Sequence, residues 1–82
     1  MLLHIGENRF VPTGDVIAIV SAEKPSAETE RTVRDCVEAG HYYSSYGRPK
    51  AYVICSRSGT TYVYAAATAV ETLKERLNES GL

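Results

Sequence analysis

The chain has 82 residues, of which 44% are hydrophobic and 23% charged, and its formal net charge is −1. These values are ordinary for a globular protein and exclude a generally disordered chain, while the length predicts a single domain over residues 1–82 with a thin core. No apolar run approaches the roughly 18 residues of a membrane helix, and the N-terminus has no secretion-signal pattern, so we expect a cytoplasmic protein without membrane association.

The first twenty residues predict three short strands. Apolar residues over 2–5 and 9–11 flank the turn Gly6-Glu7-Asn8, a pattern typical of a hairpin because Gly and Asn tolerate positive φ. After a second turn at 13–15, residues 16–20 form an uninterrupted apolar run. A run that is apolar on both faces predicts a central strand covered on each side.

A helix is predicted from Ser26, as N-cap, to about Ala39, with Gly40 as the residue that ends it. Its apolar positions repeat at helical spacing and form one face, made of Thr29, Val33, Cys36 and Val37. The opposite face is charged and carries Glu28, Arg31, Arg34, Asp35 and Glu38.

The second half of the chain predicts a loop or short edge strand followed by a turn over residues 41–50, and then a hairpin with arms 51–55 and 60–64. Thr68 and Glu71 have the spacing of a capping box and predict a second helix that ends near Asn78. Hairpins combined with two helices indicate an α+β fold with a mostly antiparallel or mixed sheet.

Neither a metal site nor a catalytic site is indicated. Cys36 and Cys55 are predicted to be free thiols in or near the core, because a disulfide does not fit a chain without an export signal. Zinc would require both cysteines to converge with His4 and His41, and none of these residues forms a close ligand pair.

Catalysis lacks an oriented set of groups. His41 lies near Ser44 and Ser45 in the sequence, but no third residue orients them, and the glycines do not form a phosphate-binding loop. We therefore expect no enzymatic activity, no cofactor and no small-molecule substrate.

The charge is segregated along the chain. Residues 39–70 contain no Asp or Glu but carry Arg48, Lys50 and Arg57 among several tyrosines. Two interpretations remain open for this segment: the bases contact phosphates, or they are a solvated edge while the tyrosines pack against the sheet. Three bases are too few for tight binding by a monomer, so the phosphate interpretation requires copies repeated in an assembly.

The order and spacing of three segments resemble the small bacterial extracellular-matrix regulatory proteins RemA and RemB. These segments are 3–7 (LHIGE), 11–19 (VPTGDVIAI) and 46–54 (YGRPKAYVI), and the RemB branch is the more similar. The resemblance implies a DNA-binding regulator, with biofilm-matrix genes as the targets of the RemA branch. It also implies a ring-like homo-oligomer that bends or wraps double-stranded DNA, and a fold similar to LytTR-type DNA-binding domains.

The resemblance also implies which residues contact DNA. Arg48 matches the first arginine of the family's Gly-Arg-Arg turn, Pro49 replaces the second, and Lys50 is the candidate substitute. A further family arginine before the apolar strand corresponds to Asp15 here. The predicted DNA-contacting set is Tyr46, Gly47, Arg48 and Lys50, supported by Arg57. The alternative is a ring-forming scaffold or protein-interaction module that does not bind DNA.

Overall fold

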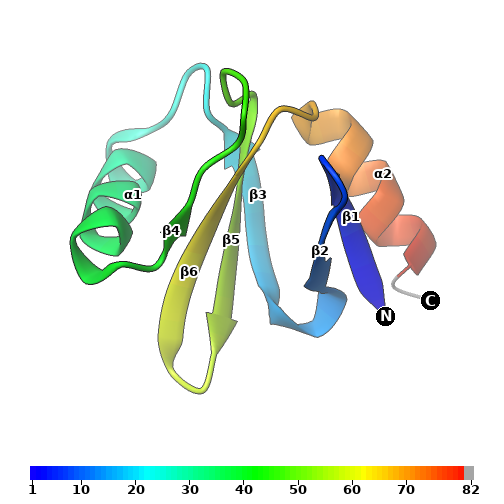
Figure 1. The fold of residues 1–82 in the computed structure, drawn as a ribbon, viewed down its shortest axis with the longest axis horizontal. Helices are drawn as coiled ribbons and strands as arrows, with labels where there is room; N and C mark the ends of the chain where they lie inside the picture. The colour runs from blue at the N-terminus through cyan, green and yellow to red at the C-terminus, as the bar shows by residue number, and fades with distance from the viewer. Residues whose placement is uncertain (81–82) are drawn as a thin grey trace.

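The computed structural model describes residues 1–80, so the last two residues of the predicted domain lie outside it. Within this range the α+β class is confirmed (Figure 1). The elements, in chain order, are β1 (Leu2–Gly6), β2 (Arg9–Pro12), the 3-10 helix η1 (Thr13–Asp15), β3 (Val16–Ser21), α1 (Ala27–Ala39), β4 (Tyr42–Tyr43), β5 (Ala51–Arg57), β6 (Thr60–Ala66) and α2 (Val70–Ser80).

A mixed four-stranded sheet forms the middle layer, with strand order β3-β5-β6-β4. β5 is antiparallel to both of its neighbours, whereas β4 lies parallel to β6 and is the short edge strand that the sequence allowed for. α1 covers one face of this sheet, while the β1–β2 hairpin and α2 lie on the other (Figure 1). None of the helices within residues 1–80 combines the length and hydropathy needed to span a bilayer.

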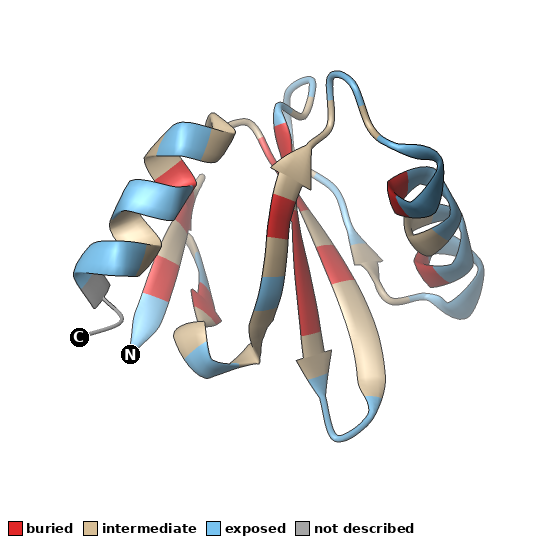
Figure 2. Ribbon diagram, turned by 180° about the vertical axis from the view of Figure 1, so that it is seen from behind, coloured by how far each residue is buried: buried red, intermediate tan, exposed pale blue. Residues whose placement is uncertain are grey.

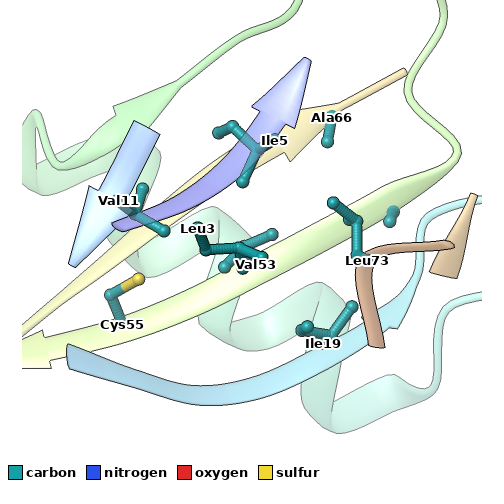
Figure 3. Packing of buried hydrophobic residues seen from close by; sticks show 9 residues of the cluster. Leu3, Ile5, Val11, Ile19, Val53, Cys55, Ala66 and Leu73 are labelled. Atoms are coloured by element: carbon teal, nitrogen blue, oxygen red, sulfur yellow. The ribbon is translucent and has the colours of Figure 1, made fainter. Parts of the chain in front are cut away.

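Alternating side chains of β5 supply a separate core on each face of the sheet. Val53 and Cys55 point toward the hairpin and α2, where Figure 3 shows them beside Leu3, Val11 and other buried residues. The neighbouring Ile54 points the other way, into a smaller cluster under α1 that also contains Cys36 and Val63. This two-residue period is the usual side-chain geometry of a strand.

The predicted central position of the apolar run was wrong, because β3 lies at the edge of the sheet. Its side chains nevertheless contact both cores, with Ile19 on one face and Ala18 and Val20 on the other. An uninterrupted apolar run thus indicates that both faces of a strand are covered. It does not indicate whether the strand has a hydrogen-bonded neighbour on one edge or on both. The ladder shifts between Val16 and Ala18, and the extra residue, Ile17, is 63% exposed.

Local signals predicted α1 well. The Ser26 hydroxyl accepts a hydrogen bond from the Thr29 amide at 3.2 Å, and Gly40 ends the helix in the left-handed conformation at φ 78°. Figure 2 shows the exposed outer surfaces of both helices. Val37 differs from its predicted place on the buried face, since it is 54% exposed.

At the second helix, Thr68 has a different role from the predicted N-cap. α2 begins at Val70, and the Thr68 hydroxyl donates to the backbone carbonyl of Ile5 at 3.3 Å. This bond joins the start of α2 to the end of β1. Gly6, at the end of β1, has φ 95°. A Cβ atom added at this position would lie only 2.8 Å from the Thr68 hydroxyl oxygen, so the site has no room for a side chain.

We therefore expect Gly6→Ala to lower the free energy of unfolding by about 1–3 kcal/mol, because alanine is strained at this φ and its methyl group crowds Thr68. Urea unfolding at fixed protein concentration measures the loss. Gly14→Ala is the matched control, since an added Cβ there meets nothing within 4 Å. Equal losses in the two variants would contradict the prediction.

Candidate nucleic-acid interface

Residues 46–50, called the basic turn below, lie in the connection between β4 and β5. The Tyr46 side chain is 97% exposed, and Gly47, Arg48 and Lys50 are also exposed. The turn is anchored at its far end, because the Lys50 amide donates to the Ala66 carbonyl at 2.8 Å and the Lys50 carbonyl accepts from the Ala22 amide at 3.0 Å. The structure therefore exposes Arg48 and Lys50 on one turn whose last residue is fixed by backbone hydrogen bonds.

Arg57 lies apart from the basic turn, at the opposite end of β5 (Figure 1). At the usual rise of about 3.3 Å per residue, the seven steps from Lys50 to Arg57 along β5 separate the two residues by about 23 Å. Its Nε lies 3.5 Å from Asp15 Oδ2, and the Arg57 side chain remains 68% exposed. The structure thus does not unite Arg57 with the other two predicted bases, and Asp15 offsets part of its charge.

A second ion pair, called the Glu7–Arg9 brace below, lies next to the chain entering the basic turn. The Arg9 guanidinium donates to Glu7 Oε1 at 2.9 Å and to the carbonyls of Ser44 at 3.0 Å and Ala65 at 2.6 Å. Glu7 Oε2 accepts from the Tyr46 amide at 2.8 Å. Sequence reasoning missed both residues, because the backbone groups of Ser44, Tyr46 and Ala65 that they bind lie 35 to 56 positions away.

Residues 39–70 contain no Asp or Glu, but acidic side chains from other parts of the chain lie close to the basic turn. A surface hollow beside the basic turn is lined by Glu23 together with Arg48 and Pro49. A neighbouring hollow places Glu23 and Glu71 with Lys50 and Lys74, between the end of β3 and the start of α2. Carboxylates that are distant in sequence therefore moderate the positive potential of the turn.

Of the tyrosines near the basic turn, some pack against the sheet and one is free to contact a ligand. Tyr43 stacks on Tyr64 with ring centroids 4.8 Å apart, and the ring centroids of His41 and Tyr62 are also 4.8 Å apart, so this row packs along the sheet. Tyr42 meets Tyr52 edge-on, at 6.4 Å. Packing thus accounts for Tyr42 and Tyr43, while the Tyr46 ring remains in solvent.

The prediction of two free cysteines in the core is confirmed. Cys36 and Cys55 belong to the separate clusters on opposite faces of the sheet. Burial raises the pKa of Cys55 to about 11, and the nearby Asp15 carboxylate adds to this. Burial also raises the pKa of Cys36. Within residues 1–80, no group of three or more His, Cys, Asp or Glu side chains is arranged to hold a metal ion.

These features define a small α+β domain that presents an exposed basic turn at one end of a helix-backed sheet. The family described as RemA-like, Extracellular matrix regulatory protein A-like, matches residues 2–77, and the chain belongs to this family. A "Putative regulatory protein" of Synechococcus sp. (strain JA-3-3Ab) is 40% identical over 76 residues, which cover 92% of this chain and 81% of that protein. A protein of the same description from Synechococcus sp. (strain JA-2-3B'a(2-13)) is 38% identical over 76 residues, which again cover 92% of this chain and 81% of that protein.

The raised pKa of Cys55 predicts a loss of stability in alkali. Because the folded pKa of about 11 exceeds the ordinary value of 9.0, the native protein retains a proton that the unfolded chain releases. The resulting stabilisation is complete below about pH 9 and disappears as the pH rises through about 11. Urea unfolding across this window should show a smaller decline for Cys55→Ala than for the native protein. Identical pH dependence in the two proteins would contradict this assignment.

Proposed function

We propose that this protein is a non-enzymatic, cytoplasmic, DNA-binding transcriptional regulator that acts as a ring-like homo-oligomer. The observation that carries the proposal is that two basic residues, Arg48 and Lys50, are both exposed on one turn whose backbone is anchored at Lys50. Membership of the RemA-like family supports a regulatory role. We further propose an affiliation with the RemB branch and a fold related to LytTR-type domains, on the resemblance carried by residues 3–7, 11–19 and 46–54.

Each part of the basic turn has a role in this proposal. Arg48 and Lys50 contact backbone phosphates, and the Tyr46 hydroxyl adds a neutral hydrogen bond. Gly47 allows close approach of the duplex, since nothing lies within 4 Å of the place a Cβ would take. Arg57 contributes less, because it lies at the other end of β5 and is paired with Asp15.

In this proposal, tight DNA binding requires several subunits, because Glu23 lies beside the two bases of each turn and offsets part of their charge. A single subunit offers too little charge for tight binding. Copies arranged in a closed assembly present their turns to one polyanion, so that each phosphate contact adds to the same bound complex. Sequence preference would then come mainly from DNA shape and deformability.

Exposed apolar residues support self-association. The outer surface of the β1–β2 hairpin presents Leu2, which is 59% exposed, and Phe10, which is 55% exposed and stacked on His4. Ile17 is 63% exposed on β3, at the edge of the sheet. Edge strands and apolar patches of this kind are common sites of association between chains.

We expect Arg48→Ala to weaken DNA binding at least about tenfold, equally on unrelated sequences, because a charge-assisted hydrogen bond to phosphate is removed. Fluorescence anisotropy on a duplex of several helical turns, over a range of salt concentrations, measures this. The slope of log K against log salt should decrease by about 0.9 for each phosphate that the protein no longer neutralises. Arg34→Ala, which removes an exposed arginine of α1, is the matched control.

Two outcomes would reject the DNA-binding proposal. One is an unchanged affinity in Arg48→Ala. The other is the absence of salt-sensitive binding by native protein that light scattering shows to be oligomeric. The second outcome would favour a ring-forming scaffold or protein-interaction module. The ion pair between Asp15 and Arg57 is the structural observation that favours this alternative.

Self-association makes a separate prediction. Ile17→Lys should shift the protein toward smaller species in multi-angle light scattering, because a charge on the bulged edge of β3 opposes strand pairing and apolar contact. Val37→Lys is the control, since Val37 is similarly exposed at 54% but lies on α1, across the sheet. Equal effects of the two changes would argue against an interface at β3.

A further inference from the structure

The Glu7–Arg9 brace contacts the first residue of the basic turn and the chain just before it. Its hydrogen bonds reach the Ser44 carbonyl and the Tyr46 amide, and they join the β1–β2 hairpin to a segment about 35 residues further along the chain. Arg9 also binds the carbonyl of Ala65 near the end of β6. The brace therefore fixes the entrance of the basic turn to the hairpin and the sheet, while Lys50 fixes its exit.

Both members of the brace occupy positions that cost stability. Glu7 has φ 57° in a two-residue hairpin turn with Asn8 at φ 60°, where glycine or asparagine is strongly preferred at the first position. Arg9 Nε is buried and has no hydrogen-bond partner within the described part of the chain. Residues that violate a local rule in this way are commonly retained for function.

Burial makes this ion pair more than a surface contact. The Glu7 and Arg9 side chains are 19% and 27% exposed, compared with 68% for Arg57 in its pair with Asp15. Partial burial reduces screening by solvent and salt, so the brace remains formed at salt concentrations that weaken exposed pairs. The two hydrogen bonds that reach Ser44 and Tyr46 are themselves exposed, and they connect this part-buried pair to the backbone just ahead of Arg48.

From these contacts we infer that Glu7 and Arg9 are positioning residues that hold the basic turn in its DNA-binding conformation. The inference rests on the proposed function and adds residues that do not themselves contact DNA. A turn ordered in advance does not lose its conformational entropy on binding, so removal of the brace lowers affinity. The number of phosphate contacts stays the same, and the salt dependence should therefore stay the same.

Glu7→Gly tests the inference at a position whose backbone conformation glycine readily adopts. Glycine adopts positive φ without steric strain, so the hairpin retains its turn while the carboxylate that binds Arg9 and Tyr46 is removed. Asn8→Gly is the matched control, because Asn8 is exposed, has similar φ, and lies outside the brace. Hydrogen–deuterium exchange of peptides covering residues 43–50 reports on the turn, and anisotropy titrations across salt report on DNA binding.

We expect Glu7→Gly to accelerate exchange in residues 43–50 and to raise the Kd for DNA about tenfold, with an unchanged salt slope. Asn8→Gly should behave as the native protein does, whereas Arg48→Ala should reduce the slope. Native affinity in Glu7→Gly, or unaltered exchange, would overturn the positioning role and leave the DNA-binding proposal intact. A native oligomer that binds no DNA would overturn both, and it is distinguished by the native titration alone.

Discussion

The burial of alternate β5 side chains on two sides of one sheet is the constraint on which the rest of this structure depends. Val53 and Cys55 require a cover on one side, and Ile54 requires one on the other. A chain of 82 residues provides those covers with few elements, namely α1 on one face and a hairpin plus α2 on the opposite face. Because each cover is thin, loss of any one would expose a whole core.

The same arrangement places charged side chains at the ends of the sheet. The basic turn lies at the start of β5, and the ion pair between Arg57 and Asp15 lies at its end. The hairpin that covers the larger core also supplies Glu7 and Arg9, so packing and organisation of the turn come from one supersecondary unit. A single carboxylate, that of Glu7, thus connects the hairpin turn to the backbone that precedes Arg48.

Electrostatics at the basic turn depend on folding more than on composition. The central segment lacks acids along the chain, yet Glu23 lines the hollow that contains Arg48. In the function we propose, a moderated charge suits a surface repeated in an assembly, because tight binding would then require assembly as well as contact. Under the same proposal, the exposed Leu2, Phe10 and Ile17 side chains are the apolar surface offered for that assembly.

The sequence by itself determined the elements whose signals are local. The Ser26 cap, the Gly40 stop, both hairpins and the strand over residues 51–55 were predicted because each depends on neighbouring residues. The two free, buried cysteines were also correctly predicted from pattern and composition. The order of three short segments indicated the RemA-like family, to which the chain belongs.

Only the tertiary structure decided which distant groups meet. It moved β3 to the edge of the sheet, separated Arg57 from the other bases, and joined Glu7 and Arg9 to residues 44–46. Hydrophobic periodicity records which side of a strand is buried, but strand order and long-range ion pairs depend on how the chain closes in three dimensions. That information is absent from any local window of sequence, and it is what places the brace against the turn.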